Sequence, residues 1–293
     1  MINSKEMEKL LKEQSLDKNF AVVYEKDAYA VQYARFLEVL AAFRELFEKD
    51  GEREVSLFSA PGRSEIGGNH TDHNHGLVLA AGISLDAIAV ASKNDEGIIR
   101  IKSAGYPLDE VNCSELDVKA EETGKSQSII RGIVSRFVQL GYKVGGFDAT
   151  TASQVLSGSG LSSSAAFEVL VCTMLNHLYN DGKIDPVEIA KISQYSENVY
   201  FGKPCGLLDQ MACSVGGFVS IDFEDTDKPV INKIDFDFAS SGHSLCIVDT
   251  KGSHSDLTDE YAAVRLEMES VAEYFGKKVL RECEKKDVIA NAG

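Results

Sequence analysis

Basic residues are scarce in this sequence of 293 residues, because 30 lysines and arginines face 46 aspartates and glutamates. The formal net charge of -16 at pH 7 argues against nucleic acid and anionic membranes as partners, since both attract cationic surfaces. An acidic chain that holds a polyanion must do so locally, with backbone N–H groups and a metal ion. The 44% hydrophobic and 26% charged residues are otherwise typical of a globular protein.

Long apolar runs and paired cysteines are also missing. No run of 18 apolar residues occurs, so no segment is predicted to cross a membrane. Residues 1–16 mix charged and apolar side chains and lack the apolar block of a signal peptide. The six cysteines contain no C-x-x-C pair, which is typical of free thiols in a reducing compartment. These features predict a cytoplasmic protein.

Apolar periodicity and turn residues outline a mixed set of elements. Helices are predicted over residues 3–16, 29–49, 126–141, 164–179, 185–200 and 258–276. Strands are predicted over residues 55–60, 77–92, 98–102, 147–155, 217–223 and 245–249. Pro61-Gly62 is expected to end the first strand, and the turn at 94–97 predicts a hairpin between the second and third strands.

This order lacks the regular alternation of strands and helices that builds a parallel sheet, so it predicts an α+β fold. The length suits two domains, or one domain and part of another. The polar stretch over residues 224–232 is the predicted boundary, which divides the chain into domains over 1–223 and 224–293.

A glycine- and serine-rich segment over residues 155–166 lies between a predicted strand and a predicted helix. Glycines let the backbone approach a ligand closely, and free N–H groups at a helix N-terminus favour an anion. No lysine follows the glycines, so the segment is not a Walker A loop. It predicts either a phosphate cradle or a plain glycine turn with a serine cap, and the small residues that continue into the helix favour the cradle.

A second segment, over residues 60–76, gathers a cation, carboxylates, amides and three histidines in one turn-rich loop. Such a density of directional groups suits a polyol, whose hydroxyls need paired donors and acceptors. The alternatives are a solvated surface loop and a metal site built from His70, Asp72, His73 and His75. The very short spacing of these four residues disfavours the metal site.

The third segment, over residues 202–211, contains a lone aspartate, Asp209, between apolar residues and a glutamine. This residue could simply cap a helix. In a cleft beside a cation, it could instead accept a proton from a hydroxyl nucleophile. The segment by itself does not decide between the two.

Taken in order, the three segments resemble those of the galactokinases, within the GHMP superfamily of small-molecule kinases. The family's first motif corresponds to Gly62-Arg63 and Gly68-Asn69-His70-Thr71-Asp72, its phosphate motif to residues 158–165, and its catalytic segment to residues 205–210. Residues 260–265 resemble the stretch that carries a sugar-contacting tyrosine. The resemblance covers most of residues 30–285. It implies a two-domain architecture, with an N-terminal domain of the ribosomal-protein-S5-like type and a C-terminal ferredoxin-like α+β domain.

The resemblance also implies a role for each matching residue. Asp209 would be the catalytic base, or the group that orients the anomeric hydroxyl of the sugar, and Arg63 would hold its carboxylate ionised. Mg²⁺ would be held by Ser164 and Glu197. The sugar would be bound by Asn69, His70, Asp72 and Tyr261. The phosphates of ATP would be bound by Gly158, Ser159, Gly160, Leu161, Ser162 and Ser163.

Three positions depart from the family pattern. Asn69 stands where the family has a glutamate that contacts a sugar hydroxyl, His73 replaces a tyrosine, and Leu156 replaces the proline that opens the phosphate loop. Because asparagine donates as well as accepts hydrogen bonds, the preferred sugar could differ from galactose. An N-acetylated hexosamine is the alternative substrate.

The family's third glycine-rich motif, Gly-x-Gly-Phe-Gly-Gly, does not occur before the sequence stops at Gly293. We therefore expect a truncated second domain, whose apolar surface the missing C-terminal portion or another chain would cover. The sequence favours an ATP-dependent kinase core that phosphorylates galactose or a close relative. Arg63 and Asp209 favour chemistry, whereas the missing motif favours the alternative of a sugar- and ATP-binding sensor without turnover.

Overall fold

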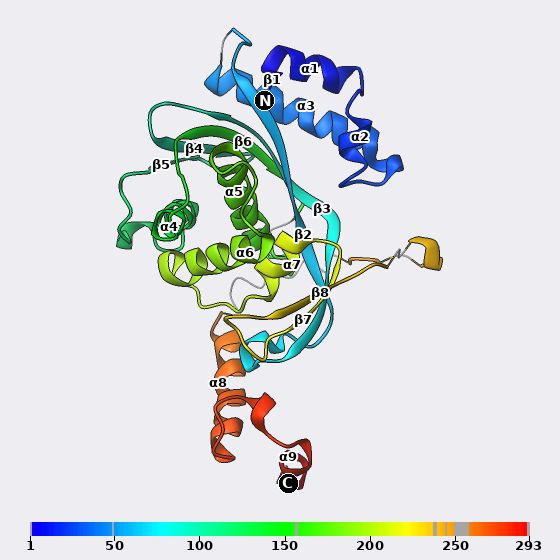
Figure 1. The fold of residues 1–293 in the computed structure, drawn as a ribbon, viewed down its shortest axis with the longest axis vertical. Coiled ribbons are helices and arrows are strands. Elements are labelled where there is room, and N and C mark those ends of the chain that lie inside the picture. Colours follow the sequence, from blue (N-terminus) through cyan, green and yellow to red (C-terminus); the bar gives the residue numbers. More distant parts are fainter. Residues whose placement is uncertain are drawn as a thin grey trace.

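The computed structural model describes residues 2–48, 50–155, 158–236, 239–243, 245–248 and 258–291, with the backbone alone at 239 and 258–262. Its framework is a mixed eight-stranded sheet (Figure 1). The strands are β1 (Ile2–Asn3), β2 (Glu54–Gly67), β3 (Leu77–Lys93), β4 (Ile98–Ser103), β5 (Leu108–Asn112), β6 (Phe147–Ser153), β7 (Phe218–Asp222) and β8 (Val230–Ile234). The helices are α1 (Ser4–Lys12), α2 (Asp17–Phe20), α3 (Tyr29–Phe47), α4 (Ser126–Gln139), α5 (Ser163–Tyr179), α6 (Pro186–Tyr195), α7 (Leu208–Val215), α8 (Thr258–Tyr274) and α9 (Lys285–Ala290).

The central strand β3 is buried on both faces, because different helices cover the two sides of the sheet (Figure 1). Ala87, Ala89 and Ala91 pack in the core built with α4 and α5. The intervening Ile88 and Val90 pack instead against α1 and α3. Side chains alternate between the faces of a strand, so a strand covered on both sides is apolar along its length. This double cover makes β3 the axis around which the other elements are placed.

Two predictions about the strands are wrong. Strand β2 does not end at Pro61 but continues to Gly67, with a shift of pairing register between Pro61 and Arg63. Strands β3 and β4 do not form a hairpin, because β6 pairs with β3 on one side and in parallel with β4 on the other. The turn at 94–97 is real, yet the strand that lies between β3 and β4 is β6, which comes much later in the chain, where no local pattern points.

The helix signals were more accurate. Asp185 caps α6 by accepting a hydrogen bond from the Val187 backbone N–H at 2.8 Å, and Pro186 occupies the first turn. The predicted helix over 185–200 ends its regular part at Tyr195 and continues as a π-helical turn over Ser196–Phe201. Such turns often lie at functional sites. Residues 245–248 form no strand, so that prediction is wrong for its described part, and residue 249 lies outside it.

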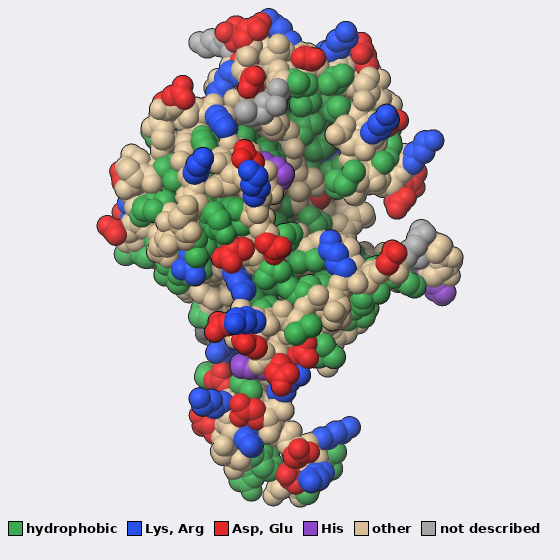
Figure 2. Space-filling model, viewed as in Figure 1, with side chains coloured by type: hydrophobic (Ala, Val, Ile, Leu, Met, Phe, Trp, Pro, Cys, Tyr) green, Lys and Arg blue, Asp and Glu red, His purple; other side chains and the backbone are tan. Residues whose placement is uncertain are grey.

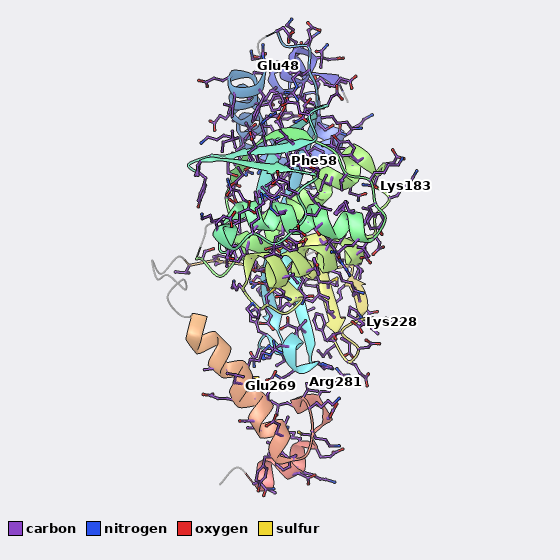
Figure 3. The ribbon with its side chains drawn as sticks, turned by 90° about the vertical axis from the view of Figure 1, so that its left-hand side faces the viewer. Glu48, Phe58, Lys183, Lys228, Glu269 and Arg281 are labelled. Carbon is purple, nitrogen blue, oxygen red and sulfur yellow. The ribbon has the colours of Figure 1, made fainter. Side chains whose placement is uncertain are left out.

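The C-terminal segment packs against the loop that follows β2. The amide of Asn74 lies 3.1 Å from the sulfur of Met268 on α8, and Arg281 forms an ion pair with Asp222 of β7. Figure 3 labels Arg281, which follows α8 in the C-terminal segment. Strand β8 pairs with β7, so residues 230–234 continue the sheet beyond 224, where the domain boundary stays a prediction. Within the described part of the chain, no helix is both long and apolar enough to cross a membrane.

Candidate active site

Arg63 joins the three chemistry-bearing segments. Its side chain is 8% exposed and reaches from β2 into the region between α7 and residues 158–163, the predicted phosphate loop. The Nε–H donates to Oδ1 of Asp209 at 2.6 Å, and Nη1 donates to the carbonyl of Gly160 at 2.6 Å. The Arg63 backbone N–H also donates to the carbonyl of Leu161 at 3.1 Å. A buried guanidinium thus fixes the position of the phosphate loop relative to Asp209.

Asp209 lies in the first turn of α7, with a third of its side chain accessible. Its second carboxylate oxygen accepts a hydrogen bond from the hydroxyl of Ser162 at 2.5 Å. Burial by itself would raise the pKa of Asp209, but the charge and hydrogen bond of Arg63 and the hydroxyl of Ser162 outweigh it. The pKa therefore lies below its ordinary value, and the carboxylate stays ionised at neutral pH.

The phosphate loop leads directly into the N-terminus of α5. Gly158 and Gly160 have φ angles of 73° and 76°, in the left-handed region that glycine tolerates, and Ser162 adopts 60° as the N-cap. The Ser162 hydroxyl makes no capping bond to the helix, because it is directed to Asp209. The N–H groups of the first turn, which begins at Ser163 and Ser164, keep the partial positive charge of a helix start. Residues 156 and 157, including Leu156, lie outside the described residues.

The loop over residues 68–76, part of the segment predicted to bind a polyol, has an unusual backbone conformation. Asn69 and His70 adopt φ angles of 53° and 51°, a conformation that asparagine and histidine accept more readily than most residues. Glu65 holds them there: one oxygen accepts a hydrogen bond from the His70 backbone N–H at 2.9 Å, and the other lies 3.3 Å from Nε2 of its ring.

Asp72 links this loop to the helix that carries Asp209. Its Oδ2 accepts a hydrogen bond from the Leu208 backbone N–H, at the start of α7, at 3.2 Å. A Cβ atom on Gly206 would lie 1.7 Å from that oxygen. Asp72 and the turn that precedes α7 therefore pack together only because Gly206 has no side chain.

Gly206→Ala tests this contact. We expect the added methyl to displace the Asp72 carboxylate from Leu208 and to lower the free energy of unfolding by about 1–3 kcal/mol. Thermal unfolding measures this effect. Gly67→Ala is the matched control, because no atom lies within 4 Å of its added Cβ. Equal behaviour of the two variants would contradict this account of Asp72.

A second group of polar side chains lies close to Asp209, on α5, α7 and the π-helical turn. Glu197, on the π-helical turn, is buried, and its two oxygens contact Nζ of Lys203 at 3.4 Å and Nε2 of Gln210 at 2.8 Å. Gln210 also donates to Glu168 of α5 at 3.1 Å. Burial, and then the neighbouring carboxylate of Glu197, raise the pKa of Glu168 well above its ordinary value. Glu197 thus offers a carboxylate oxygen, the kind of hard donor that magnesium prefers.

The structure connects some of the predicted site residues directly: Arg63 contacts Asp209, Gly160 and Leu161, Ser162 contacts Asp209, and Asp72 contacts the start of the helix that carries Asp209. Tyr261 lies on α8, but its side chain is outside the described part. Among the residues described, no three His, Cys, Asp or Glu side chains gather as a metal site, so the histidine-rich alternative for the 60–76 loop is not formed there. The sequence analysis missed Glu65, Glu168 and Lys203, and assigned no role to Gln210. The one available signal was Glu168, the single acidic residue in a helix that is mostly apolar.

Two family models match the segments that build this region. The galactokinase galactose-binding signature matches residues 41–93, and the GHMP kinases N terminal domain matches residues 128–217. The galactokinase of Streptomyces coelicolor is 35% identical over 251 residues, which are 85% of this chain. The chain is therefore similar to the galactokinases over most of its length.

Other galactokinases and their relatives extend this result. The galactokinase of Pyrococcus furiosus is 32% identical over 78% of this chain. The chain spans 63% of the length of the Streptomyces coelicolor galactokinase and 62% of that from Pyrococcus furiosus. A solved galactokinase of Lactococcus lactis, complexed with galactose, matches with a TM-score of 0.69 at 23% identity, over 86% of this chain and 65% of that one. Methanococcus jannaschii mevalonate kinase matches with a TM-score of 0.56 at 16% identity, over 81% and 75% of the two chains.

These likenesses confirm the predicted α+β fold of the GHMP-kinase type and the predicted resemblance to the galactokinases. The face of the molecule in Figure 2 shows acidic and basic side chains interspersed. The roles predicted for individual site residues stay predictions.

Proposed function

We propose that this protein is an ATP-dependent kinase that transfers the γ-phosphoryl group to the anomeric hydroxyl of galactose. The observation that carries the proposal is the double contact of Arg63, which joins a carboxylate able to hold a hydroxyl, Asp209, to a loop able to hold phosphates at Gly160. The relatives named galactokinase and the galactose-binding signature over residues 41–93 support the choice of sugar.

In this proposal the sugar lies between the 69–72 loop and Asp209. Asn69, His70 and Asp72 supply donors and acceptors for its hydroxyls, and Tyr261 is a further proposed contact. Asp209 orients the anomeric hydroxyl towards the phosphate loop. Phosphoryl transfer proceeds through a loose transition state, so little proton removal is needed before the bond to phosphorus forms. An aspartate whose pKa is held low is a weak base but a good hydrogen-bond acceptor, which suits this orienting role.

The phosphates of ATP are proposed to bind along residues 158–163, where the backbone N–H groups at the start of α5 provide positive potential. Arg63, beside Gly160, would stabilise the negative charge that spreads over the transferred group. Positioning and charge stabilisation would then account for most of the rate.

Magnesium is the proposed metal, and the residues present fit it. Ser164 supplies a hydroxyl at the helix start, and Glu197 a buried carboxylate whose repulsion of Glu168 a divalent cation would reduce. When bound, the ion would neutralise charge on the phosphates of ATP. Glu197 would orient one oxygen for this purpose, while Gln210 holds the other.

Helix α8 and strand β8 expose several large apolar side chains. Val264, Leu266, Val271 and Tyr274 of α8 are exposed in the structure, as are Val230 and Ile234 of β8. We propose that additional C-terminal sequence or another chain covers them. The six cysteines are all unpaired, which supports our proposal of a cytoplasmic location.

A panel of sugars tests the proposed function. We expect ADP release to require both Mg²⁺ and sugar, with galactose preferred over glucose, mannose and N-acetylgalactosamine. Release that does not depend on sugar, or a preference for a sugar without the galactose configuration, would contradict the proposal. A coupled assay of ADP gives the ranking.

Asn69 variants separate galactose from the N-acetylated alternative. Asn69→Asp keeps the size and the left-handed backbone preference but loses the N–H donors. We expect its kcat/KM for galactose to stay within about tenfold of the parent value, because a hydroxyl can donate to a carboxylate. Asn69→Glu restores the usual family residue and should also retain galactose as the preferred sugar. A parent that prefers N-acetylgalactosamine, and loses it in Asn69→Asp, would favour the alternative.

A further inference from the structure

Three buried polar side chains meet beneath the proposed magnesium site. Glu168 comes from α5, Glu197 from the π-helical turn and Gln210 from α7, and their residues are 0%, 2% and 0% exposed. Each of the three elements also carries or adjoins a proposed active-site residue: Ser164 on α5, Glu197 itself, and Asp209 on α7. The cluster therefore connects three elements that each carry or adjoin a proposed active-site residue.

The amide of Gln210 is oriented by both carboxylates. Its single nitrogen has two N–H groups, and it lies 3.1 Å from Oε2 of Glu168 and 2.8 Å from Oε2 of Glu197. Lys203 contacts the opposite oxygen of Glu197 at 3.4 Å, from a side chain that is half exposed. Glu197 is thus held by a buried amide on Oε2, its inner oxygen, whereas Oε1, its outer oxygen, faces the ammonium group of Lys203, which a bound magnesium ion would displace.

Burying these three polar side chains in the core costs free energy that apolar side chains would not. Two of its acceptors, Oε1 of Glu168 and Oε1 of Gln210, are buried without a hydrogen-bond partner among the described residues. Buried polar groups are usually paired, and well-packed apolar side chains of similar size often give equal or greater stability. A role in stability alone does not explain these residues.

We propose that Gln210 and Glu168 are positioning residues that fix the inner oxygen of Glu197, so that its outer oxygen can bind the magnesium ion of the nucleotide. This inference rests on the proposed function, because it takes Glu197 as the metal ligand. Glu168 acts through Gln210: it occupies one N–H, which leaves the other directed at Glu197. Partners of this kind commonly change metal affinity by about 10–100-fold when they are removed.

The test is a magnesium titration of the protein with a non-hydrolysable ATP analogue, followed by thermal unfolding. For Gln210→Met, which keeps the length but not the amide, we expect the magnesium concentration at half of the stabilisation to rise about 10–100-fold. Glu168→Met should show a smaller rise in the same direction. Glu168→Gln is the matched control, because an amide there can still accept a hydrogen bond from Gln210, and it should stay within about threefold of the parent.

Steady-state kinetics separates positioning from general damage. In Gln210→Met we expect a higher magnesium requirement and a lower kcat, with the KM for galactose within about twofold of the parent, since the amide of Gln210 bonds to Glu168, Glu197 and Cys205. Unchanged magnesium affinity in Gln210→Met would overturn the proposal. Loss of the fold in both methionine variants would also overturn it, by showing a purely structural role.

The failure of the proposed function would look different. A parent protein that binds magnesium with the ATP analogue, and loses this binding in Gln210→Met, but shows no galactose-dependent ADP release, would retain the positioning role and reject the kinase assignment. A parent with galactose-dependent turnover and a normal magnesium response in Gln210→Met would do the reverse.

Discussion

Asp209→Asn is expected to lower kcat by roughly 10²–10⁴-fold while leaving the fold intact. The amide keeps the shape of the side chain and can still accept the hydrogen bond that Arg63 Nε donates at 2.6 Å. It cannot hold a negative charge next to the attacking hydroxyl, and it is a poorer acceptor for the hydroxyls of the sugar and of Ser162. The measurement is single-turnover transfer from ATP to galactose, compared with calorimetric binding of galactose alone.

Two further variants define what the Asp209 result means. Asp209→Ala should also lose activity, but it leaves the buried guanidinium of Arg63 without its carboxylate, so its stability should fall as well. Asp148→Asn is the control, because Asp148 is a buried carboxylate paired with Arg53 at 2.8 Å, on the strand β6. Turnover in Asp209→Asn that matches Asp148→Asn would remove Asp209 from the mechanism.

Arg63→Met is expected to lower kcat by about 10³-fold or more, because it removes a cation placed beside both the carboxylate and the phosphate loop. It should also change the pH dependence of any activity that remains. Burial raises the pKa of Asp209, and in the parent Arg63 and Ser162 outweigh that effect. Without the guanidinium the pKa should rise. The pH below which kcat/KM falls should therefore move upward.

A pH–rate profile of Arg63→Met against the parent measures this shift. Arg131→Met provides the matched control, since Arg131 is another buried arginine and forms an ion pair with Glu122 at 2.6 Å. It should lose stability of the same order and keep the parent's acid limb. An acid limb that stays in place when Arg63 is removed would show that this arginine does not control the ionisation of Asp209.

The elements of this fold were largely predictable, because each carries a local signal. The cap formed by Asp185 and the double-faced apolar run of β3 are visible in the sequence. The order of strands was not, since β6 enters between β3 and β4 through contacts between residues far apart in the chain. Pro61 made the strand prediction wrong, because proline is expected to end a strand where its missing N–H would be needed for pairing. On the side of β2 opposite β3, the described pairing with β1 involves only Glu54 and Val55, away from the proline, so Pro61 can lie within β2.

The site divides in a similar way. Arg63 stands out because charged and polar groups cluster around it in the sequence, and Asp209 because it is a lone carboxylate between apolar residues and a glutamine. The importance of Glu168 and Gln210 depends instead on three helical segments converging in space. Glu65 was overlooked because its contact with His70 requires the left-handed backbone at residues 69 and 70, which the sequence does not specify.

The most direct test is a crystal structure of the protein with galactose, Mg²⁺ and a non-hydrolysable ATP analogue. We expect the anomeric hydroxyl within hydrogen-bond distance of Asp209, and the γ-phosphate between Arg63 and the start of α5 at Ser163. Galactose bound away from the 69–72 loop, or phosphates bound away from residues 158–163, would show that the segments joined by Arg63 do not form a phosphoryl-transfer site.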